Sequence, residues 1–435
     1  KQEETARILA KGWKGESIKV SFNDTELDPK AETEIEISAD SHSKPLVIQI
    51  STYNYFFKPY HFSVGDFSDS EIIEWHWEEG TAGQNTLFLQ QKPFITLDEP
   101  LESKCQYTLN APRLVILDSD ETLILPDGVE QLTELELSCC ESLTNVDALK
   151  NLAKLTELDL GGCPSLTELD LSNCESLSNV DGLQNLTSLT KLDLSWCESL
   201  SNIDGLQHLT QLTKLDLHGC RSLSNVDGLQ GLTSLTELDL KHCKSLSNVD
   251  GLQNLTSLKH LNLYACESLS NIDGLQHLTQ LTTLKLSECE SLNNVDALKN
   301  LTQLTTLDLS YCRSLSNVDG LQHLTNLTEL DLCDCESLSN VDALKNLTQL
   351  TTLDLSGRNG RKSLSNVDVL QNLTNLTKLV LLWCESLSNV DALQHLTSLR
   401  ELDLRMCESL SNVDGLQHLT SLTKLDLEGC FSLSN

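Results

Sequence analysis

The sequence predicts an α/β solenoid, a chain wound into similar coils that each pack only on their neighbours. A unit of 23 residues recurs with minor edits from about residue 132 to residue 435. Inside each unit, a short segment alternates apolar and polar residues. Cysteines mark the period, each of the following lying 23 residues after the one before: Cys174, Cys197, Cys220, Cys243, Cys266, Cys289, Cys312 and Cys335. A fixed period of this length is typical of stacked repeats.

The alternating segment predicts a short strand in every unit. In one copy, Leu192 and Leu194 alternate with Lys191, Asp193 and Ser195. Alternation places the leucines on one side of a strand and the polar residues on the other. Successive units then add parallel strands to one sheet, with the leucines turned towards the core.

The second half of the unit predicts a short helix or 3₁₀ turn. Asp204 is expected to be the helix N-cap, and Gln207 has the spacing of a capping box. The same turn is expected to carry three leucines into the core: Leu206, Leu209 and Leu212.

Two interruptions break the period. Cys163 and Cys174 are only 11 residues apart, which predicts that one unit lacks its convex segment. The segment 356–362, SGRNGRK, lengthens another unit by three residues and brings three cations together. Insertions at one edge of a solenoid are either binding loops or harmless ones, and both interpretations stay open here.

Residues 1–112 have a different composition and predict a separate domain. Several β-rich runs are separated by turn formers, and aromatic residues concentrate in 53–62 and 74–77. This pattern indicates a small antiparallel β-sandwich. Residues 113–131 are expected to form irregular coils that lead into the solenoid, which occupies 132–435.

The repeat pattern LxxLxLxxC, followed by LxxL, resembles the leucine-rich repeat family. The phrase NVDGLQNLTSLTxLDLS is most similar to the internalin-like bacterial subclass, although cysteine stands where asparagine is commoner. The resemblance implies a horseshoe with a concave parallel sheet and short convex helices or 3₁₀ turns. It also implies that the concave face binds proteins and that the protein is secreted or lies on a bacterial cell surface.

The 16 cysteines predict buried thiols rather than disulfides. Most occupy one column of the repeat, where stacked units lie ~4.8 Å apart. Side chains in such a column point the same way and not towards each other, as a disulfide needs. We therefore expect free cysteines that act as small apolar residues. Unpaired cysteines favour a reducing cytosol, whereas the resemblance implies the cell surface, and both remain open.

Charge and motif content argue against several functions. The net charge of −34 repels nucleic acids and anionic membranes. There is no apolar run long enough to span a bilayer. We find no catalytic triad, phosphate-binding loop or zinc-spaced cluster, so we expect no enzyme, cofactor or metal site. His218 and His242 lie in neighbouring units near Asp216 and Asp239, but we interpret them as surface residues.

An aspartate recurs between the two strand leucines and predicts an acidic track. Asn262, Lys285 and Val380 interrupt the column. It is either a solvated face that keeps the sheet soluble or a track for a basic partner or cations. The residues assigned to the track are Asp193, Asp216, Asp239, Asp308, Asp331 and Asp354.

Large side chains gather in the two positions before the repeat cysteine and predict a partner-binding surface. Aromatic residues and arginine are common anchors of interfaces. The strongest apolar patch is expected around Trp383, with the 357–362 loop at its rim; the alternative is a packing defect that this loop covers. The candidate residues are Val380, Leu382, Trp383, Arg405, Met406, Trp196, Tyr264 and Tyr311.

Two functions follow from these observations. The first is a non-enzymatic recognition module that binds a protein partner on its concave face, a basic partner if the acidic track takes part. The alternative is a structural or adhesive subunit of a cell-surface filament. It is suggested by residues 430–435, which leave the final unit without a cap, so that copies would assemble head to tail.

Overall fold

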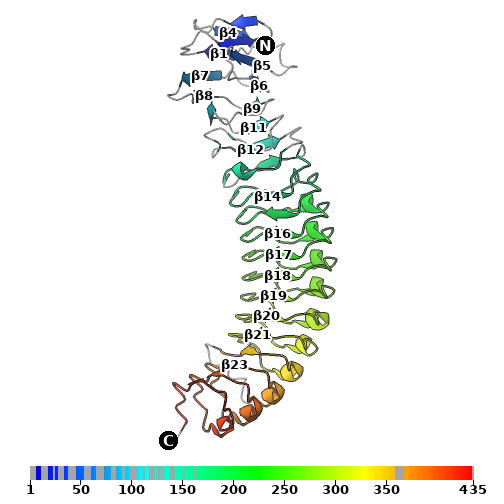
Figure 1. Ribbon diagram of the computed structural model, residues 1–435, viewed down its shortest axis with the longest axis vertical. Coiled ribbons are helices and arrows are strands. Elements are labelled where there is room, and N and C mark those ends of the chain that lie inside the picture. Colours follow the sequence, from blue (N-terminus) through cyan, green and yellow to red (C-terminus); the bar gives the residue numbers. More distant parts are fainter. Residues whose placement is uncertain are drawn as a thin grey trace. The chain divides into compact units, whose positions relative to one another are not determined.

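The structure is a computed structural model that describes two compact units, residues 1–209 and 210–435 (Figure 1). Before residue 117 it describes strands. Beyond that point it describes residues 123, 125, 129, 132–137, 143–149, 152–160, 163–357 and 367–433. Most of the predicted 357–362 loop is therefore outside the described residues.

The first unit begins with strands that form two mixed sheets. One has the order β10-β8-β7-β1-β4 and the other β13-β12-β11-β9-β6-β5-β2-β3. The pairs β8/β10, β1/β7 and β9/β11 are parallel, so the pairing is not wholly antiparallel as expected. The strands are β1 Ala6–Ala10, β2 Ile18–Phe22, β3 Thr25–Leu27, β4 Glu34–Ile37, β5 Leu46–Thr52, β6 Tyr60–Val64, β7 Ile73–Glu79, β8 Asn85–Gln90, β9 Phe94–Leu97, β10 Cys105–Asn110, β11 Arg113–Ile116, β12 Glu134–Leu137 and β13 Glu157–Asp159.

Strand β11 lies in the stretch that the sequence predicted to be irregular. It pairs in parallel with β9 on one side and with β12 on the other. The β-rich segment and the first repeats therefore share one sheet. The proposed domain boundary at residue 112 falls between two of its strands.

The predicted solenoid is confirmed by the strands that follow. In the first unit, β14 Glu168–Asp170 pairs in parallel with β15 Lys191–Asp193. In the second unit, ten strands pair in parallel and in chain order, and the middle leucine of each of the first nine is buried. They are β16 Lys214–Asp216, β17 Glu237–Asp239, β18 His260–Asn262, β19 Thr283–Lys285, β20 Thr306–Asp308, β21 Glu329–Asp331, β22 Thr352–Asp354, β23 Lys378–Val380, β24 Glu401–Asp403 and β25 Lys424–Asp426.

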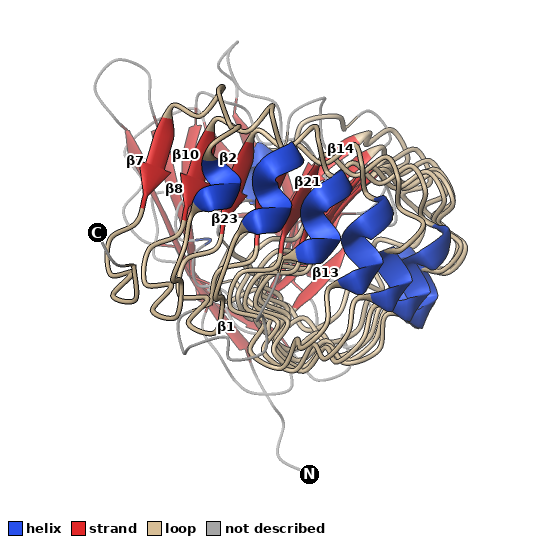
Figure 2. Cartoon of the chain, turned by 90° about the horizontal axis from the view of Figure 1, so that it is seen from below, coloured by secondary structure: helices blue, strands red, loops and turns tan. Residues whose placement is uncertain are grey.

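The helical segments of the described repeats are 3₁₀ turns, which follow one another in a row (Figure 2). They are η3 Asp147–Leu149, η4 Asp204–Leu206, η5 Asp227–Leu229, η6 Asp250–Leu252, η7 Asp273–Leu275, η8 Asp296–Asn300, η9 Asp319–Leu321, η10 Asp342–Asn346, η11 Asp368–Asn372, η12 Asp391–His395 and η13 Asp414–Leu416.

The predicted capping box is wrong. Asp204 is the first residue of η4, the N-cap is Ile203, and no side chain makes a cap hydrogen bond. Instead the side-chain oxygen of Asn202 accepts the N–H of Asp204 at 2.7 Å. The same bond recurs through the repeats, as from Asp273 to Asn271 at 2.8 Å. The asparagine that precedes each turn therefore fixes its start.

The repeat cysteines form a ladder inside the core, and the predicted buried thiols are confirmed for the described column. In most coils the Sγ donates to a leucine carbonyl of the preceding coil, at 3.2 Å from Cys243 to Leu217 and from Cys266 to Leu240. Burial raises the pKa of Cys266 to about 12, which keeps the thiol protonated. The thiol thus supplies a hydrogen-bond donor as well as apolar volume.

At the short unit between Cys163 and Cys174, the strand side of one coil lies next to the turn side of the following coil. The segment holds strand β14 but no 3₁₀ turn, as predicted. Strand β13 ends its sheet, and Leu160 N–H donates instead to Gly182 O at 3.2 Å, in the turn segment of the next coil. On the other side, Cys174 Sγ reaches Leu149 O of η3 at 3.8 Å. Within the first unit, one sheet therefore stops and a second one starts half a coil away.

Candidate functional site

The candidate site is the solvent-facing side of the strands β16–β25, which we call the sheet face. Each strand contributes its first and third residues, and the second residue after the strand follows on the same side because side chains alternate. The register aligns these positions from strand to strand, so Asp308, Asp331 and Asp354 pair directly across β20, β21 and β22. Each outward position thus forms a column across the sheet.

The aspartate column has a structural role that the sequence analysis missed. The Oδ1 of Asp216 accepts the N–H of His218 at 2.8 Å, and Asp239 accepts that of Lys241 at the same distance. Such Asx turns end the strand two residues later. Asn262 makes the same bond to Tyr264 at 3.1 Å, so the turn needs a side-chain oxygen and not a charge.

In the central part of the acidic track, burial and like charges outweigh the hydrogen bond from Cys333 and the charge of Lys378 at Asp331. Burial raises the pKa of Asp331 to about 6, and the neighbouring carboxylates of Asp354 and Asp308 add to the effect. A carboxylate in partly buried surroundings prefers its neutral form, because it loses water and faces like charges. Whether the track binds a basic partner stays a prediction.

Each described residue that precedes a repeat cysteine has a left-handed backbone, which the sequence analysis did not predict. Positive φ angles range from 54° at Asp334 to 63° at Trp383, while Gly219 and Gly429 have 77°. Glycine at three places in this column of the sequence and asparagine at a fourth were the available signal. The other non-glycine members include Asn173, Trp196, His242, Ala265, Glu288, Tyr311 and Met406.

The predicted patch around Trp383 is held together by hydrogen bonds between neighbouring coils. Trp383 N–H donates to Arg405 O at 2.9 Å, and Met406 N–H donates to Glu428 O at 2.7 Å. The side chains of Val380, Leu382, Trp383 and Met406 are each half-buried. They form neither a closed core nor a fully exposed cluster.

Arg405 is not a free cation at this patch. Its Nη2 lies 2.6 Å from Asp403 Oδ2, its Nε 3.0 Å from Asp403 Oδ1, and its Nε 3.6 Å from Asp426 Oδ2. Burial opposes ionisation of Asp403, yet the hydrogen bonds and charge of Arg405 prevail and lower its pKa. The charge of the guanidinium is therefore shared with two carboxylates.

A second cluster crosses β16–β19. The rings of His218 and His242 lie 5.5 Å apart, and His242 meets Tyr264 edge-on at 5.2 Å. Lys241 Nζ lies 5.2 Å from the Tyr264 ring centre, and Tyr264 donates its hydroxyl to Glu288 Oε1 at 2.6 Å. That bond chiefly raises the pKa of Tyr264 to about 12. Of this cluster, the sequence singled out Tyr264 as a binding residue.

The remaining candidates lie apart from these two clusters. Tyr311 follows β20 and donates its N–H to Cys333 O at 2.7 Å. Trp196 and Asp193 lie in the first unit, where Asp193 Oδ1 accepts the N–H of Ser195 at 2.8 Å. Trp196 is half-buried, like Tyr311.

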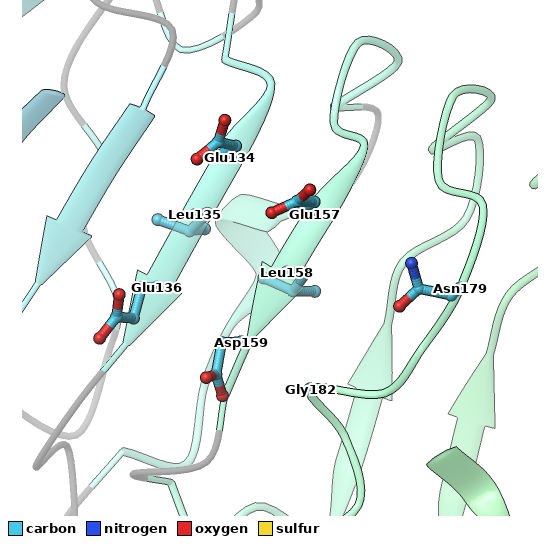
Figure 3. A pocket seen from close by; sticks show the side chains of 8 residues that line it. All are labelled: Glu134, Leu135, Glu136, Glu157, Leu158, Asp159, Asn179 and Gly182. Carbon is cyan, nitrogen blue, oxygen red and sulfur yellow. The ribbon is translucent and has the colours of Figure 1, made fainter. Parts of the chain in front are cut away.

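The first unit has an acidic hollow at the end of its sheet. Figure 3 shows the carboxylates of Glu134 and Glu136 on β12 and of Glu157 and Asp159 on β13, with Asn179 opposite them. It adjoins the short unit, because Gly182 takes the place beside β13 where another strand would pair. The 11-residue spacing of Cys163 and Cys174 was the one sequence signal for this hollow.

The described part of the chain shows neither a metal cluster nor a membrane-spanning helix. Within those residues, no three His, Cys, Asp or Glu side chains are placed to hold a metal ion. Over the same residues, no helix has the length and hydropathy needed to cross a bilayer.

Two family models match the sequence. The model of the BspA type leucine-rich repeat region matches residues 118–179, 170–284 and 359–435, which is more than half of the chain. The model of Zer-1-like leucine-rich repeats matches residues 295–366. No curated protein matches the chain.

Three of the solved structures that match this chain come from two bacteria. Internalin InlF from Listeria monocytogenes has 22% identity and a TM-score of 0.41, with 68% of this chain and 87% of that chain covered. Internalin C2 from the same organism has 31% identity and a TM-score of 0.36, covering 43% and 79%. A leucine-rich repeat protein from Leptospira interrogans has 21% identity and a TM-score of 0.45, covering 74% and 85%.

Proposed function

This chain belongs to the BspA type leucine-rich repeat family, and on that basis we propose that it is a non-enzymatic recognition module whose sheet face binds a protein partner. Leucine-rich repeat proteins generally mediate protein–protein interactions. The observation that carries the proposal is the half-buried apolar group of Val380, Leu382, Trp383 and Met406 on an otherwise polar sheet face.

The Trp383 patch supplies the burial energy in this proposal. An interface needs an apolar centre surrounded by polar groups that exclude water. Val380 stands where most coils have an aspartate, so the local repulsion between carboxylates is lower. The Arg405–Asp403–Asp426 group then forms a polar border on one side.

The partner's chemistry follows from the neighbouring strands. Asp308, Asp331 and Asp354 form an unbroken run of carboxylates beside the patch. A partner with lysine or arginine opposite this run would relieve the like-charge repulsion that helps raise the pKa of Asp331. We therefore propose a partner with an apolar anchor and an adjacent basic segment.

A photo-crosslinking residue tests the location of the interface. Placed at Leu382, it should capture the partner, whereas the same residue at exposed Gln394 in turn η12 should not. Once the partner is captured, Trp383→Ala should weaken binding by roughly 2 kcal/mol with little change in melting temperature. A large fall in melting temperature without a binding defect would assign Trp383 to the core and remove the patch.

Head-to-tail self-association is the second proposal. In the last repeat, Leu425 is 42% exposed and Phe431 is 78% exposed, which offers apolar area to another copy. Leu425→Lys combined with Phe431→Lys should abolish any concentration-dependent sedimentation. Assemblies of unchanged size in the double variant would exclude this surface.

A further inference from the structure

The sheet face has one place where two successive strands present no carboxylate. The outward residues of β18 and the position after it are His260, Asn262 and Tyr264. Those of β19 are Thr283, Lys285 and Ser287. Lys285 carries the one formal charge among these six side chains, with histidine counted as neutral. In contrast, the outward positions of β20–β22 hold Asp308, Glu329, Asp331 and Asp354 and no cation.

The carboxylates around this place already have hydrogen-bond donors. Asp239 accepts Asn262 Nδ2 at 3.0 Å, and Glu288 accepts the Tyr264 hydroxyl at 2.6 Å. Asp308 accepts Ser287 Oγ at 2.9 Å and Ser310 Oγ at 2.7 Å. These bonds satisfy the anions from within the sheet face.

The two cations at this place lack such compensation. Lys285 is exposed and makes no ion pair among the described residues, although Asp308 is its neighbour in the register. Lys241 lies over the Tyr264 ring at 5.2 Å and likewise has no ion pair within the described part. An ammonium beside an aromatic ring retains its capacity to bind an anion.

The aromatic rings add an apolar surface beside Lys241. His218, His242 and Tyr264 are in ring contact across three strands, and all are half-buried. Tyr264 is held by its bond to Glu288, so little side-chain entropy remains to be lost on binding. Burial, followed by Lys241, lowers the pKa of His242, which leaves the ring neutral at pH 7.

We propose that Lys241, Tyr264 and Lys285 form a docking surface for an acidic segment of a partner protein. The segment's carboxylates bind the two ammonium groups, and its adjacent side chains pack on the His242 and Tyr264 rings. This inference rests on the proposed use of the sheet face for recognition. It adds a surface that binds negative charge, whereas the acidic run of Asp308, Asp331 and Asp354 is proposed to bind positive charge.

Fluorescence anisotropy with a labelled peptide of alternating glutamate and glycine tests the proposal. The full chain should bind this peptide, and Lys285→Asp should weaken binding about 10-fold, since a charge-assisted contact contributes about 1.5 kcal/mol or more. Lys285→Asp restores the residue that most coils carry in this column, so the fold should be kept. Lys285→Asn, which matches Asn262 on the neighbouring strand, serves as a second variant if the first misfolds.

Lys424→Asp is the matched control, because it makes the same charge change at an exposed position on β25. It should change the affinity less than about twofold, as an exposed charge several strands away is screened. A glutamate peptide that does not bind, or that binds Lys285→Asp as well as the natural chain, would overturn the proposal. Tighter, Lys285-dependent binding of a single-stranded oligonucleotide would also overturn it.

The result separates this surface from the Trp383 patch. Trp383→Ala should leave glutamate-peptide binding unchanged. If Trp383→Ala weakens it and Lys285→Asp does not, the present inference fails while the proposed function stands. If captured partners depend on Lys285 and not on Trp383, the proposed patch fails instead.

Discussion

At the scale of single residues, the sheet face is built from side chains that serve the backbone before they serve a partner. The column aspartates accept an N–H two residues ahead, and each described residue before a repeat cysteine has a left-handed backbone. Both features turn the chain sharply after a strand of only three residues. A substitution at a column aspartate changes the charge, and one at the residue before the cysteine changes the backbone strain. The two effects can therefore be measured separately.

Asp331→Asn should stabilise the protein at high pH. The folded pKa of about 6 lies above the ordinary 3.8, so the folded state favours the protonated carboxyl, and stability falls as pH rises from 4 to 7. Asparagine keeps the turn, as Asn262 does, and removes the charge. We expect a gain of about 1 kcal/mol at pH 8 after allowance for solvent screening, and none at pH 4, measured by urea unfolding.

Asp403→Asn is the control with the opposite sign. Arg405 lowers the pKa of Asp403 despite its burial, so this carboxylate contributes stability above its unfolded pKa and loses it as pH falls. The variant should be less stable than the natural chain at pH 7. If the stability of both variants changed with pH in the same way, the described surroundings of Asp331 and Asp403 would be wrong.

Two substitutions at Trp383 measure the backbone strain. Because φ is 63° there, Trp383→Gly should be about 1 kcal/mol more stable than Trp383→Ala, although both remove the ring. The order should reverse at Leu382, which is not among the described residues with positive φ. Thermal unfolding of the four variants gives the comparison, and the same order at both positions would contradict the left-handed assignment.

At the scale of elements, the second residue of each 3₁₀ turn from η4 onward goes with the length of that turn. Turns with glycine at the second position, such as η6 and η9, span three residues. Those with alanine or valine there, such as η8 and η11, span five. A Cβ at Gly251 would lie 2.1 Å from Val226 O of the preceding coil, so the glycine turns approach their neighbour more closely.

Gly251→Ala should therefore destabilise the repeat array by about 1–3 kcal/mol, because the added methyl group forces two coils apart. The reverse change, Ala297→Gly in η8, should cost only about 1 kcal/mol through backbone entropy. Urea unfolding measures both. A Gly251→Ala protein as stable as the natural chain would mean that these turns separate without cost.

At the scale of the whole molecule, the chain combines a net charge of −34 with an interior built mainly of leucine and cysteine. Among the described residues, Asp334 is the one buried charged side chain, and the repeat cysteines are buried and free. Neighbouring coils are joined by thiol and threonine hydrogen bonds to backbone carbonyls, as from Thr305 Oγ1 to Thr282 O at 3.0 Å. The array is thus stabilised coil by coil rather than by cross-links.

Thiol titration tests this description of the core. Of the cysteines whose state the structure describes, Cys333 is half-buried and the others are buried. Native protein should therefore react slowly at all of them except Cys333, and unfolding without reductant should release the rest. Thiols that stay unreactive after unfolding would reveal disulfides and contradict the free-cysteine ladder.

The local sequence pattern was enough to predict the periodic part of this protein. The spacing of Leu192, Leu194 and Cys197 sufficed for a parallel strand, a buried leucine and a buried thiol in every coil, because each coil meets the same neighbour. The 11-residue spacing of Cys163 and Cys174 also predicted that one segment is missing there. The solenoid, the free cysteines and the family followed from these local patterns.

The three-dimensional structure was needed for contacts that depend on backbone geometry or on which coils are neighbours. It placed Asn202 rather than Asp204 at the start of the turn, paired Arg405 with Asp403 and Asp426, and brought His218, His242, Tyr264 and Glu288 together. It also showed that β13 ends one sheet at the short unit and that β14 begins another. The Asn202 contact recurs in the repeats but depends on the backbone angles of the turn, and the ring cluster joins residues in neighbouring repeats, so residue types and spacing alone did not predict them.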